Sequence, residues 1–376
     1  MGGIDDDRLD DLLEGLDDDR RASRRRLLDR LLDDGIPPET IREAAAADTL
    51  TALLAAQVLG GQAKYTAEDI SRMTNMNLDF VLAVRRASGL PVRDLDDIAY
   101  FDQDLESMQD VKRLRDLGLS DDRLLDVIRV LARGLAHTAE SMRQLSLELV
   151  LEPGDDEEQL ALRWAALAEI VLPIAGHSIE RVLLLHLREV FSTEALLPDD
   201  TQAGALPESR PTAVCFADLV GFTRLGEELP ATELSAVADR LVQIAEHVVS
   251  GDVRFVKTIG DAVMLVSPSV DHLLEAAFTL VDAADAEGED FPQLRAGIGY
   301  GHALNRHGDW FGRPVNRASR ITALARPGTV LATESAREHA GPQWRWSSLP
   351  PRRVKGVSGE MRLFRARRDD GRRQRT

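Results

Sequence analysis

Residues 1–190 place apolar side chains three and four positions apart with charged residues between them, which is the pattern of amphipathic helices. Within residues 66–90 the spacing predicts two short helices, with Thr66 capping the first and a turn at residues 75–77. The longest helical patterns lie at residues 21–34, 124–149 and 159–191. The first half of the chain is therefore predicted to be all-α.

After residue 211 the pattern changes to short apolar runs that alternate with helical stripes. One stripe runs from Leu234 to Val248 and another from Leu273 to Val281. Strands are predicted near residues 213–217, 253–256, 262–266, 295–300 and 330–333. This alternation favours an α+β domain with a split βαβ core under two helices. Residues 192–211 lack sustained periodicity and predict a linker.

The two short helices within residues 66–90 resemble a helix–turn–helix, which makes DNA binding one candidate function. Arg72, Arg85 and Arg86 would suit phosphate contacts, but acidic residues stand among them. The whole chain also carries a formal net charge of −18, which would repel nucleic acids and anionic membranes. The segment is therefore interpreted as a packing unit, and no nucleic-acid partner is expected.

The composition is that of a soluble globular protein, with 376 residues, 44% hydrophobic and 29% charged. Its length suits two domains. The single cysteine, Cys215, excludes an intramolecular disulfide and fits a reducing cytoplasm. The start of the chain is acidic, unlike a signal peptide, and the longest apolar stretch, residues 164–187, is interrupted by charge. A cytoplasmic protein without a membrane span is expected.

Two segments of the second half place an aspartate at the exit of an apolar run. Asp218 ends the run VCFAD at residues 214–218, and Asp261 follows Gly260 after a second run. A strand that leads into a glycine-containing turn lets backbone N–H groups approach an anion. Two carboxylates beside such a turn can hold hard cations against it. These residues predict a two-metal phosphate site.

A third segment, residues 308–322, adds Asp309, Asn316 and Arg320. Pro314 suits the first turn of a helix, and Asn316 and Arg320 would then lie four residues apart on one face. A planar guanidinium is well shaped for phosphate oxygens. The second half of the chain therefore supplies carboxylates, an amide and a guanidinium for a phosphate ligand.

In their order, these segments resemble the catalytic core of class III nucleotide cyclases over residues 210–368. With a helical half in front, the chain resembles actinobacterial adenylyl cyclases that carry an N-terminal regulatory domain. The resemblance implies conversion of ATP to 3′,5′-cyclic AMP and pyrophosphate by a ferredoxin-like βαββαβ core. It implies an all-α regulatory domain (1–191), a linker (192–211), the catalytic domain (212–368) and a basic tail (369–376).

The resemblance also implies how the cations and phosphates are held. Asp218 and Asp261 would bind two divalent cations, Mg²⁺ or Mn²⁺, and the backbone carbonyl of Leu219 would add a ligand. The amides around Phe222 and Thr223 would surround the phosphates of ATP. The expected cofactors are therefore two divalent cations in each site.

The remaining residues of the resemblance concern the base, the ribose and the transition state. Lys257 and Asp309 match the purine-selecting pair, a donor for N1 of adenine and an acceptor for its amine, and guanine would mispair with both. Asn316 would orient the ribose, and Arg320 would stabilise charge on the α-phosphate. Lys355 resembles the lysine that binds the terminal phosphate. ATP is therefore favoured over GTP.

In this family the metal aspartates and the purine and transition-state residues of one site come from opposite subunits. All of them occur on this chain, so a homodimer with two equivalent sites is expected. The alternatives are a catalytically inactive cyclase fold that senses nucleotides and a guanylyl cyclase. The complete residue set argues against the first, and Lys257 with Asp309 argues against the second.

The helical half is predicted to regulate the catalytic half by autoinhibition. His137, His177 and His186 lie in it, and histidine titrates near neutral pH, so relief of this inhibition by protonation is predicted. The apolar residues between positions 170 and 187 are interpreted as a core or a dimer seam. The alternative is a pocket for a small apolar ligand.

Overall fold

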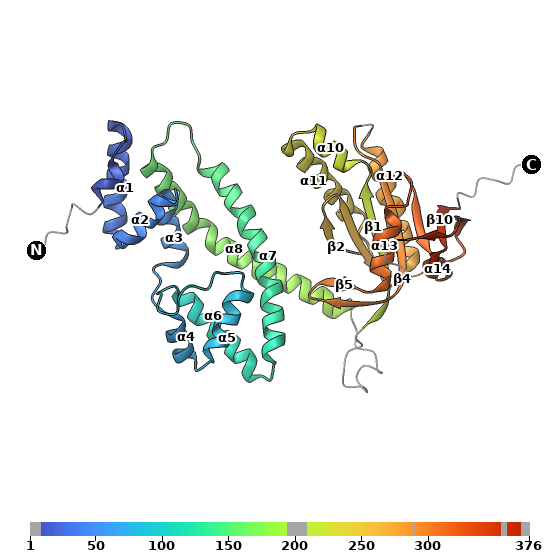
Figure 1. The fold of residues 1–376 in the computed structure, drawn as a ribbon, viewed down its shortest axis with the longest axis horizontal. Coiled ribbons are helices and arrows are strands. Elements are labelled where there is room, and N and C mark those ends of the chain that lie inside the picture. Colours follow the sequence, from blue (N-terminus) through green and yellow to red (C-terminus); the bar gives the residue numbers. More distant parts are fainter. Residues whose placement is uncertain (1–8, 194–208, 289, 355–358, 370–376) are drawn as a thin grey trace, which may run out of the picture. The chain divides into compact units, whose positions relative to one another are not determined.

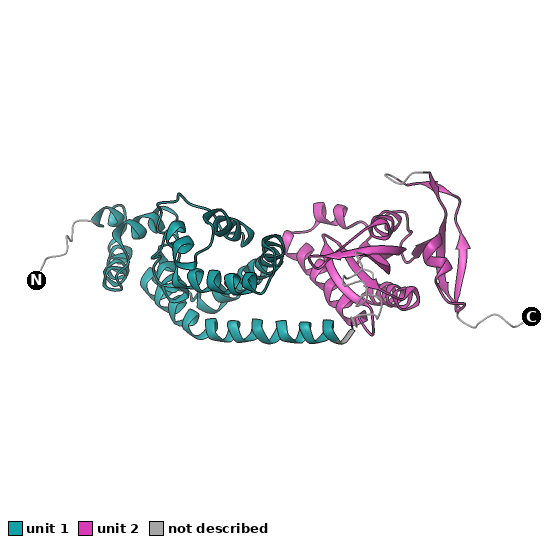
Figure 2. Cartoon of the chain, turned by 90° about the horizontal axis from the view of Figure 1, so that it is seen from below, with its two compact units in different colours: residues 1–195 teal, residues 196–376 magenta. Residues whose placement is uncertain are grey.

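The computed structural model describes residues 9–193, 209–288, 290–354 and 359–369. The chain divides into two compact units, unit 1 with residues 1–195 and unit 2 with residues 196–376 (Figure 2). Unit 1 is built from helices, and unit 2 combines a sheet with helices on its faces (Figure 1). The predicted order, a helical half followed by an α+β half, is confirmed.

Unit 1 follows the helical spacing of the sequence closely. Thr66 caps α4 and a turn follows the helix, as the sequence predicts; the structure adds a capping box with Asp69 and a left-handed conformation at Asn75. The helices of unit 1 are α1 (Asp18–Asp33), α2 (Pro38–Ala46), α3 (Leu53–Gly60), α4 (Ala67–Thr74), α5 (Leu78–Ala87), α6 (Asp102–Asp116), α7 (Asp121–Val150) and α8 (Glu157–Thr193).

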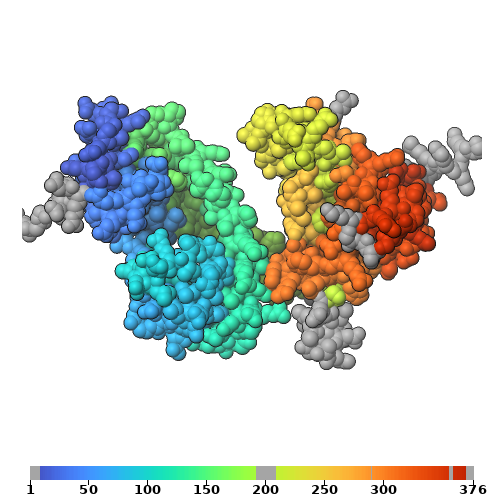
Figure 3. Space-filling view, viewed as in Figure 1, coloured from blue at the N-terminus to red at the C-terminus, as the bar shows by residue number. Residues whose placement is uncertain are grey.

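Two clusters of buried side chains hold unit 1 together. One joins the first helices through Leu27, Leu31 and Ile41 and reaches Ala161 at the start of α8. The other surrounds Val81 and joins α4 and α5 to α6 and to the start of α7. The first helices of the chain are blue in Figure 3, and the colour passes to cyan over α4 to α6. The helix–turn–helix segment is therefore part of a packed core, as the sequence analysis favours.

Helix α8 is anchored at its start and exposed further along. Arg24 donates to both carboxylate oxygens of Glu157 at 2.5 Å, which fixes the first turn of α8 to α1. Later apolar residues are exposed, including Val182 at 51% and Leu185 at 65%. Residues 157–191 are also long and apolar enough to cross a membrane, contrary to the length argument made from the sequence. This is weak evidence for a span, because packing helices meet the same criteria.

Unit 2 is organised around one mixed sheet with the strand order β2-β3-β1-β4-β6-β10-β7, in which β5 pairs only with β4. The five strands predicted from the sequence are present as β1 to β4 and β6, whereas β5, β7 and β10 were not predicted. The strands of this sheet are β1 (Arg210–Leu219), β2 (Arg254–Ile259), β3 (Ala262–Ser267), β4 (Leu294–Arg306), β5 (Asp309–Phe311), β6 (Val330–Thr333), β7 (Trp344–Ser348) and β10 (Leu363–Arg368). A separate small hairpin pairs β8 (Arg352–Arg353) with β9 (Glu360–Met361).

The first part of unit 2 has the predicted ferredoxin-like order. Helix α11 (Ala231–Val248) connects β1 to β2, and α12 (Val270–Ala286) connects β3 to β4. The strands therefore run β1-α11-β2-β3-α12-β4, and they lie in the order β2-β3-β1-β4 in the sheet. Antiparallel pairing of β1 with both β3 and β4 makes β1 the central strand of this core.

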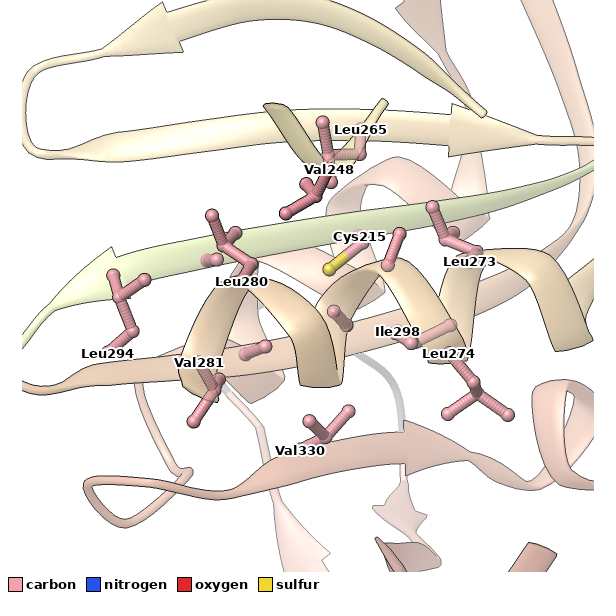
Figure 4. Close-up of a cluster of buried hydrophobic side chains, with 14 of the residues drawn as sticks. Cys215, Val248, Leu265, Leu273, Leu274, Leu280, Val281, Leu294, Ile298 and Val330 are labelled. Carbon is pink, nitrogen blue, oxygen red and sulfur yellow. The ribbon is translucent and has the colours of Figure 1, made fainter. Parts of the chain in front are cut away.

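The two faces of the sheet are covered differently. Helices α11 and α12 bury the larger cluster, with Leu273 and Leu280 packed against β1, β3 and β4 (Figure 4). Cys215 points into this cluster, and complete burial raises the pKa of its thiol to about 12, so it is an inert core residue. Helix α13 (Arg313–Thr322) packs on β1 and β4 through a second cluster that contains Phe216 and Ala318.

Candidate active site

Alternation along β1 determines which side of the sheet carries Asp218. Val214 and Phe216 belong to the cluster beneath α13, whereas Cys215 and Ala217 face α12. Since side chains alternate along a strand, Asp218 continues the α13 face at the exit of β1. Its side chain is 20% exposed. The predicted metal aspartate therefore lies at the open end of this face.

Asp261 lies beside Asp218 because of the turn between β2 and β3. Gly260 in this turn has φ of 61°, a conformation that favours glycine, and Asp261 follows it directly. Ala262, the next residue, is the register partner of Asp218. Partial burial and the negative charge of Asp218 raise the pKa of the Asp261 carboxyl above its ordinary value. The structure thus brings the two predicted metal ligands together.

Arg295 is a site residue that the sequence analysis missed. It is the register partner of Asp218 on β4, and its Nη2 and Nε lie 2.6 Å and 3.0 Å from Asp218 Oδ2. Its Nη1 also donates to the carbonyl of Ala323, just after α13, at 3.2 Å. The sequence feature that could have identified Arg295 is its position, since it is an arginine at the start of a predicted strand that is otherwise apolar. Arg295 places a fixed positive charge beside the two aspartates.

Lys257 reaches the same face through a β-bulge in β2. Phe255 pairs with Leu265, but Lys257 pairs with Met264, so Val256 is the extra residue. Without the bulge, Phe255 and Lys257 would point to the same side of the sheet. Phe255 instead packs against the α12 cluster, while Met264 lies in the α13 cluster. The bulge therefore turns Lys257 toward the side that holds Asp218.

Lys257 and Asp309 form an ion pair, although they are far apart in the sequence. Asp309 begins β5, and its Oδ1 accepts a hydrogen bond from the amide of Trp310 at 2.8 Å. The side chains of Lys257 and Asp309 are 38% and 31% exposed, so both remain open to a ligand. The expected donor and acceptor for a purine edge are thus adjacent, and they are contributed by two different strands.

Asn316 and Arg320 lie on α13 but point away from the sheet of their own unit. Pro314, Ala318, Ile321 and Thr322 form the buried face of this helix. Asn316 is exposed and Arg320 is partly exposed, since each is about half a helical turn around from Ala318. The structure therefore directs these two side chains away from the sheet that carries Asp218 at the end of β1.

The proposed phosphate-binding turn follows β1 directly. Gly221 has φ of 82° and precedes α10 (Phe222–Glu228), a short helix on the surface of unit 2 coloured yellow in Figure 3. The first amides of a helix have no partner within it, so those of Phe222 and Thr223 are available to an anion.

Leu219, whose carbonyl is a predicted metal ligand, is buried at the end of β1. Lys355 lies outside the described residues.

The donor set fits hard divalent cations. Asp218 and Asp261 offer carboxylate oxygens at one edge of the sheet, and their mutual repulsion is relieved when a cation binds. Among the described residues no group of three or more His, Cys, Asp or Glu side chains could hold a metal. Further ligands would therefore come from backbone carbonyls, water or nucleotide phosphates.

Comparison with known proteins identifies the family. Residues 5–191 match the adenylate cyclase regulatory domain, and residues 206–365 match the adenylate and guanylate cyclase catalytic domain. A pH-sensitive adenylate cyclase of Mycobacterium tuberculosis is 42% identical over 97% of this chain and 93% of its own length. The chain belongs to the class III adenylate cyclases.

Other adenylate cyclases match most of this chain at lower identity. The adenylate cyclase of Streptomyces griseus is 30% identical over 76% of this chain and 70% of its own length. That of Glutamicibacter nicotianae is 28% identical over 78% of this chain and 74% of its own length. The sequence-based identification as an actinobacterial-type adenylate cyclase is therefore confirmed.

The raised pKa of Asp261 leads to a test of the metal site. Asp261→Asn should abolish cyclic AMP formation but stabilise metal-free unit 2 by about 0.5 kcal/mol at neutral pH, the scale of a solvent-screened charge interaction. This gain should disappear as the pH falls through the raised pKa, because the wild-type carboxyl then takes up a proton and loses its repulsion.

Chemical denaturation without divalent cations, at pH 8 and at a series of lower pH values, measures this difference. Asp239→Asn, at an exposed aspartate of α11, is the matched control and should change neither stability nor activity. Retained activity in Asp261→Asn, or a loss of stability at pH 8, would contradict the assignment.

Proposed function

We propose that this adenylate cyclase converts ATP to 3′,5′-cyclic AMP and pyrophosphate at composite sites shared by two copies of the chain. The observation that supports this proposal is the orientation of α13, which points Asn316 and Arg320 away from the sheet of their own unit. A helix that packs on the sheet cannot turn its outer face to that sheet. A second copy therefore supplies the missing partners for each site.

In this proposal each residue has a role set by its chemistry. Asp218 and Asp261 hold two divalent cations, Mg²⁺ or Mn²⁺, with the Leu219 carbonyl as a further ligand. These cations lower the pKa of the attacking ribose hydroxyl and neutralise charge on the triphosphate. Asn316 orients the ribose, and the Arg320 guanidinium stabilises the charge that develops on the α-phosphate.

The phosphates and the base have their own contacts in the proposed site. The amides at Phe222 and Thr223, and the side chain of Lys355, bind the phosphates. The ion pair between Lys257 and Asp309 supports selection of adenine, because these groups already stand side by side and are partly exposed. An adenine edge offers an acceptor to the lysine and a donor to the carboxylate. This pairing favours ATP over GTP as substrate.

We further propose that the helical part regulates the catalytic part, with a regulatory domain at residues 1–191, a linker at 192–211, a catalytic domain at 212–368 and a tail at 369–376. Support comes from the Mycobacterium tuberculosis relative, which is a pH-sensitive adenylate cyclase. His137, His177 and His186 are all the histidines of residues 1–191. Their protonation is proposed to relieve autoinhibition in a cytoplasmic enzyme.

Mixing two inactive variants tests the shared site. Asp218→Ala and Arg320→Ala chains should each be inactive, and a mixture that exchanges subunits should recover up to about a quarter of wild-type activity. In a mixed dimer, one site carries both changes and the other carries neither. No recovery, with subunit exchange shown independently, would contradict the shared-site proposal.

Exchange of the purine pair tests nucleotide selection. Lys257→Glu combined with Asp309→Cys should lower the ratio of kcat/KM for ATP to that for GTP by about tenfold or more, because donor and acceptor are both lost. The control is Arg240→Glu with Glu287→Cys, which disrupts an exposed ion pair elsewhere in unit 2. An unchanged ratio in the first variant would place base recognition at other residues.

Replacing the three histidines tests regulation. Between pH 8 and pH 6, the full chain should gain activity relative to residues 210–376 alone, since only the full chain carries the inhibitory part. Changing His137, His177 and His186 to Gln should remove this relative gain. Parallel pH profiles for the unmodified full chain and residues 210–376 would refute the regulatory proposal.

A further inference from the structure

One buried hydroxyl connects the two elements that carry the proposed catalytic groups. Thr322, the last residue of α13, is 3% exposed. Its Oγ1 lies 3.2 Å from the carbonyl oxygen of Phe216 and 2.8 Å from that of Ala318. Phe216 precedes Asp218 by two residues, and Thr322 follows Arg320 by two. The hydroxyl therefore bridges the strand of the metal ligand and the helix of the arginine.

The backbones meet closely at the same place. A Cβ on Gly297 would lie 2.6 Å from the amide nitrogen and Oγ1 of Thr322, and one on Gly299 would lie 2.5 Å from the carbonyl of Pro314. Only glycine permits such an approach of β4 to α13. The helix is thus in direct contact with β4 near both of its ends. Sliding or rotation of α13 would have to displace backbone atoms.

The two acceptors of Thr322 have different consequences. A contact with the carbonyl four residues earlier is common for a threonine within a helix and fixes only its own side chain. The contact with Phe216 joins two separate elements, so it links the last turn of α13 to β1, in addition to the backbone contacts that α13 makes with β4. Valine has nearly the same shape as threonine and lacks the hydroxyl. It would keep the volume filled and remove the contacts of the hydroxyl with Phe216 and Ala318, of which only the first joins α13 to β1.

We propose that Thr322 is a positioning residue for the cyclase reaction, acting through the placement of Arg320 relative to the sheet. The inference rests on the proposed function, because it assigns to Arg320 the stabilisation of the transition state. Misplacement of such a group lowers the rate of the chemical step more than it weakens substrate binding. The hydroxyl of Thr322 therefore supports kcat and contributes little to KM.

The first test compares matched threonine variants of the full-length enzyme. Thr322→Val should lower kcat about tenfold and leave KM for ATP within about twofold, while Thr322→Ser, which keeps the hydroxyl, should retain most of kcat. The control is Thr212→Val on β1, another buried threonine, whose hydroxyl donates to the nearby carbonyl of Arg210 at 3.0 Å. It should leave both constants within about twofold.

The second test places Thr322→Val in only one chain of the mixed dimer. In the active site of that dimer, the Asp218→Ala chain supplies Arg320 and the Arg320→Ala chain supplies Asp218. Thr322→Val should therefore lower the recovered activity strongly in the Asp218→Ala chain and much less in the Arg320→Ala chain. A general loss of folding would lower the recovered activity equally in both placements.

The proposal is overturned if Thr322→Val keeps kcat within about twofold of wild type, if Thr322→Ser is impaired as strongly as Thr322→Val, or if both placements in the mixed dimer give equal losses. If Thr322→Val does not fold, Thr322→Ala replaces it, with Thr212→Ala as control. Failure of the parental mixture to recover activity would count against the shared site alone, and the variants of the unmixed enzyme would still decide the role of Thr322.

Discussion

The close contact between α13 and the central sheet is the constraint on which the rest of unit 2 depends. Glycines on β4 let the helix backbone approach directly, and the buried face of α13 is fully used in that contact. Asn316 and Arg320 must then lie on the outer face, four residues apart. In the proposed function, this packing is what calls for a second chain, because Asp218 and Asp261 remain at the sheet.

The two neighbouring aspartates, Asp218 and Asp261, make the other part of the site electrostatically unfavourable. Asp218 and Asp261 are held close together by the register of β1 with β3, and partial burial with mutual repulsion raises the pKa of Asp261. Arg295 offsets part of that repulsion through its contacts with Asp218. Such an arrangement costs folding stability and prepares a site for cations and phosphates. This cost is common where binding groups are assembled before the ligand arrives.

Much of this organisation follows from local patterns in the sequence. The cap at Thr66, the turn at residues 75–77 and the strands β1 to β4 and β6 were all predicted, since each rests on alternation, helical spacing or turn chemistry. The bulge at Val256 and the pairing of Arg295 with Asp218 were not predicted. Both depend on the register between strands, which one sequence does not specify by local pattern.

The predicted site residues illustrate the same limit. Spacing along the chain placed Asn316 and Arg320 on one face of a helix, but only the packing of α13 shows that this face points outward. The direction of this face is a tertiary property. The exposed length of α8 is another, because helical spacing predicted the helix without showing that its later apolar side chains would lie open in the single chain.

The most direct test of the account is the dependence of specific activity on protein concentration, measured beside the fraction of dimer by sedimentation. With saturating ATP and divalent cation, a site shared between chains predicts that cyclic AMP formation per chain falls in proportion to the dimer fraction on dilution. Constant activity per chain, down to concentrations at which the protein is monomeric, would show that one chain suffices and would contradict the shared site.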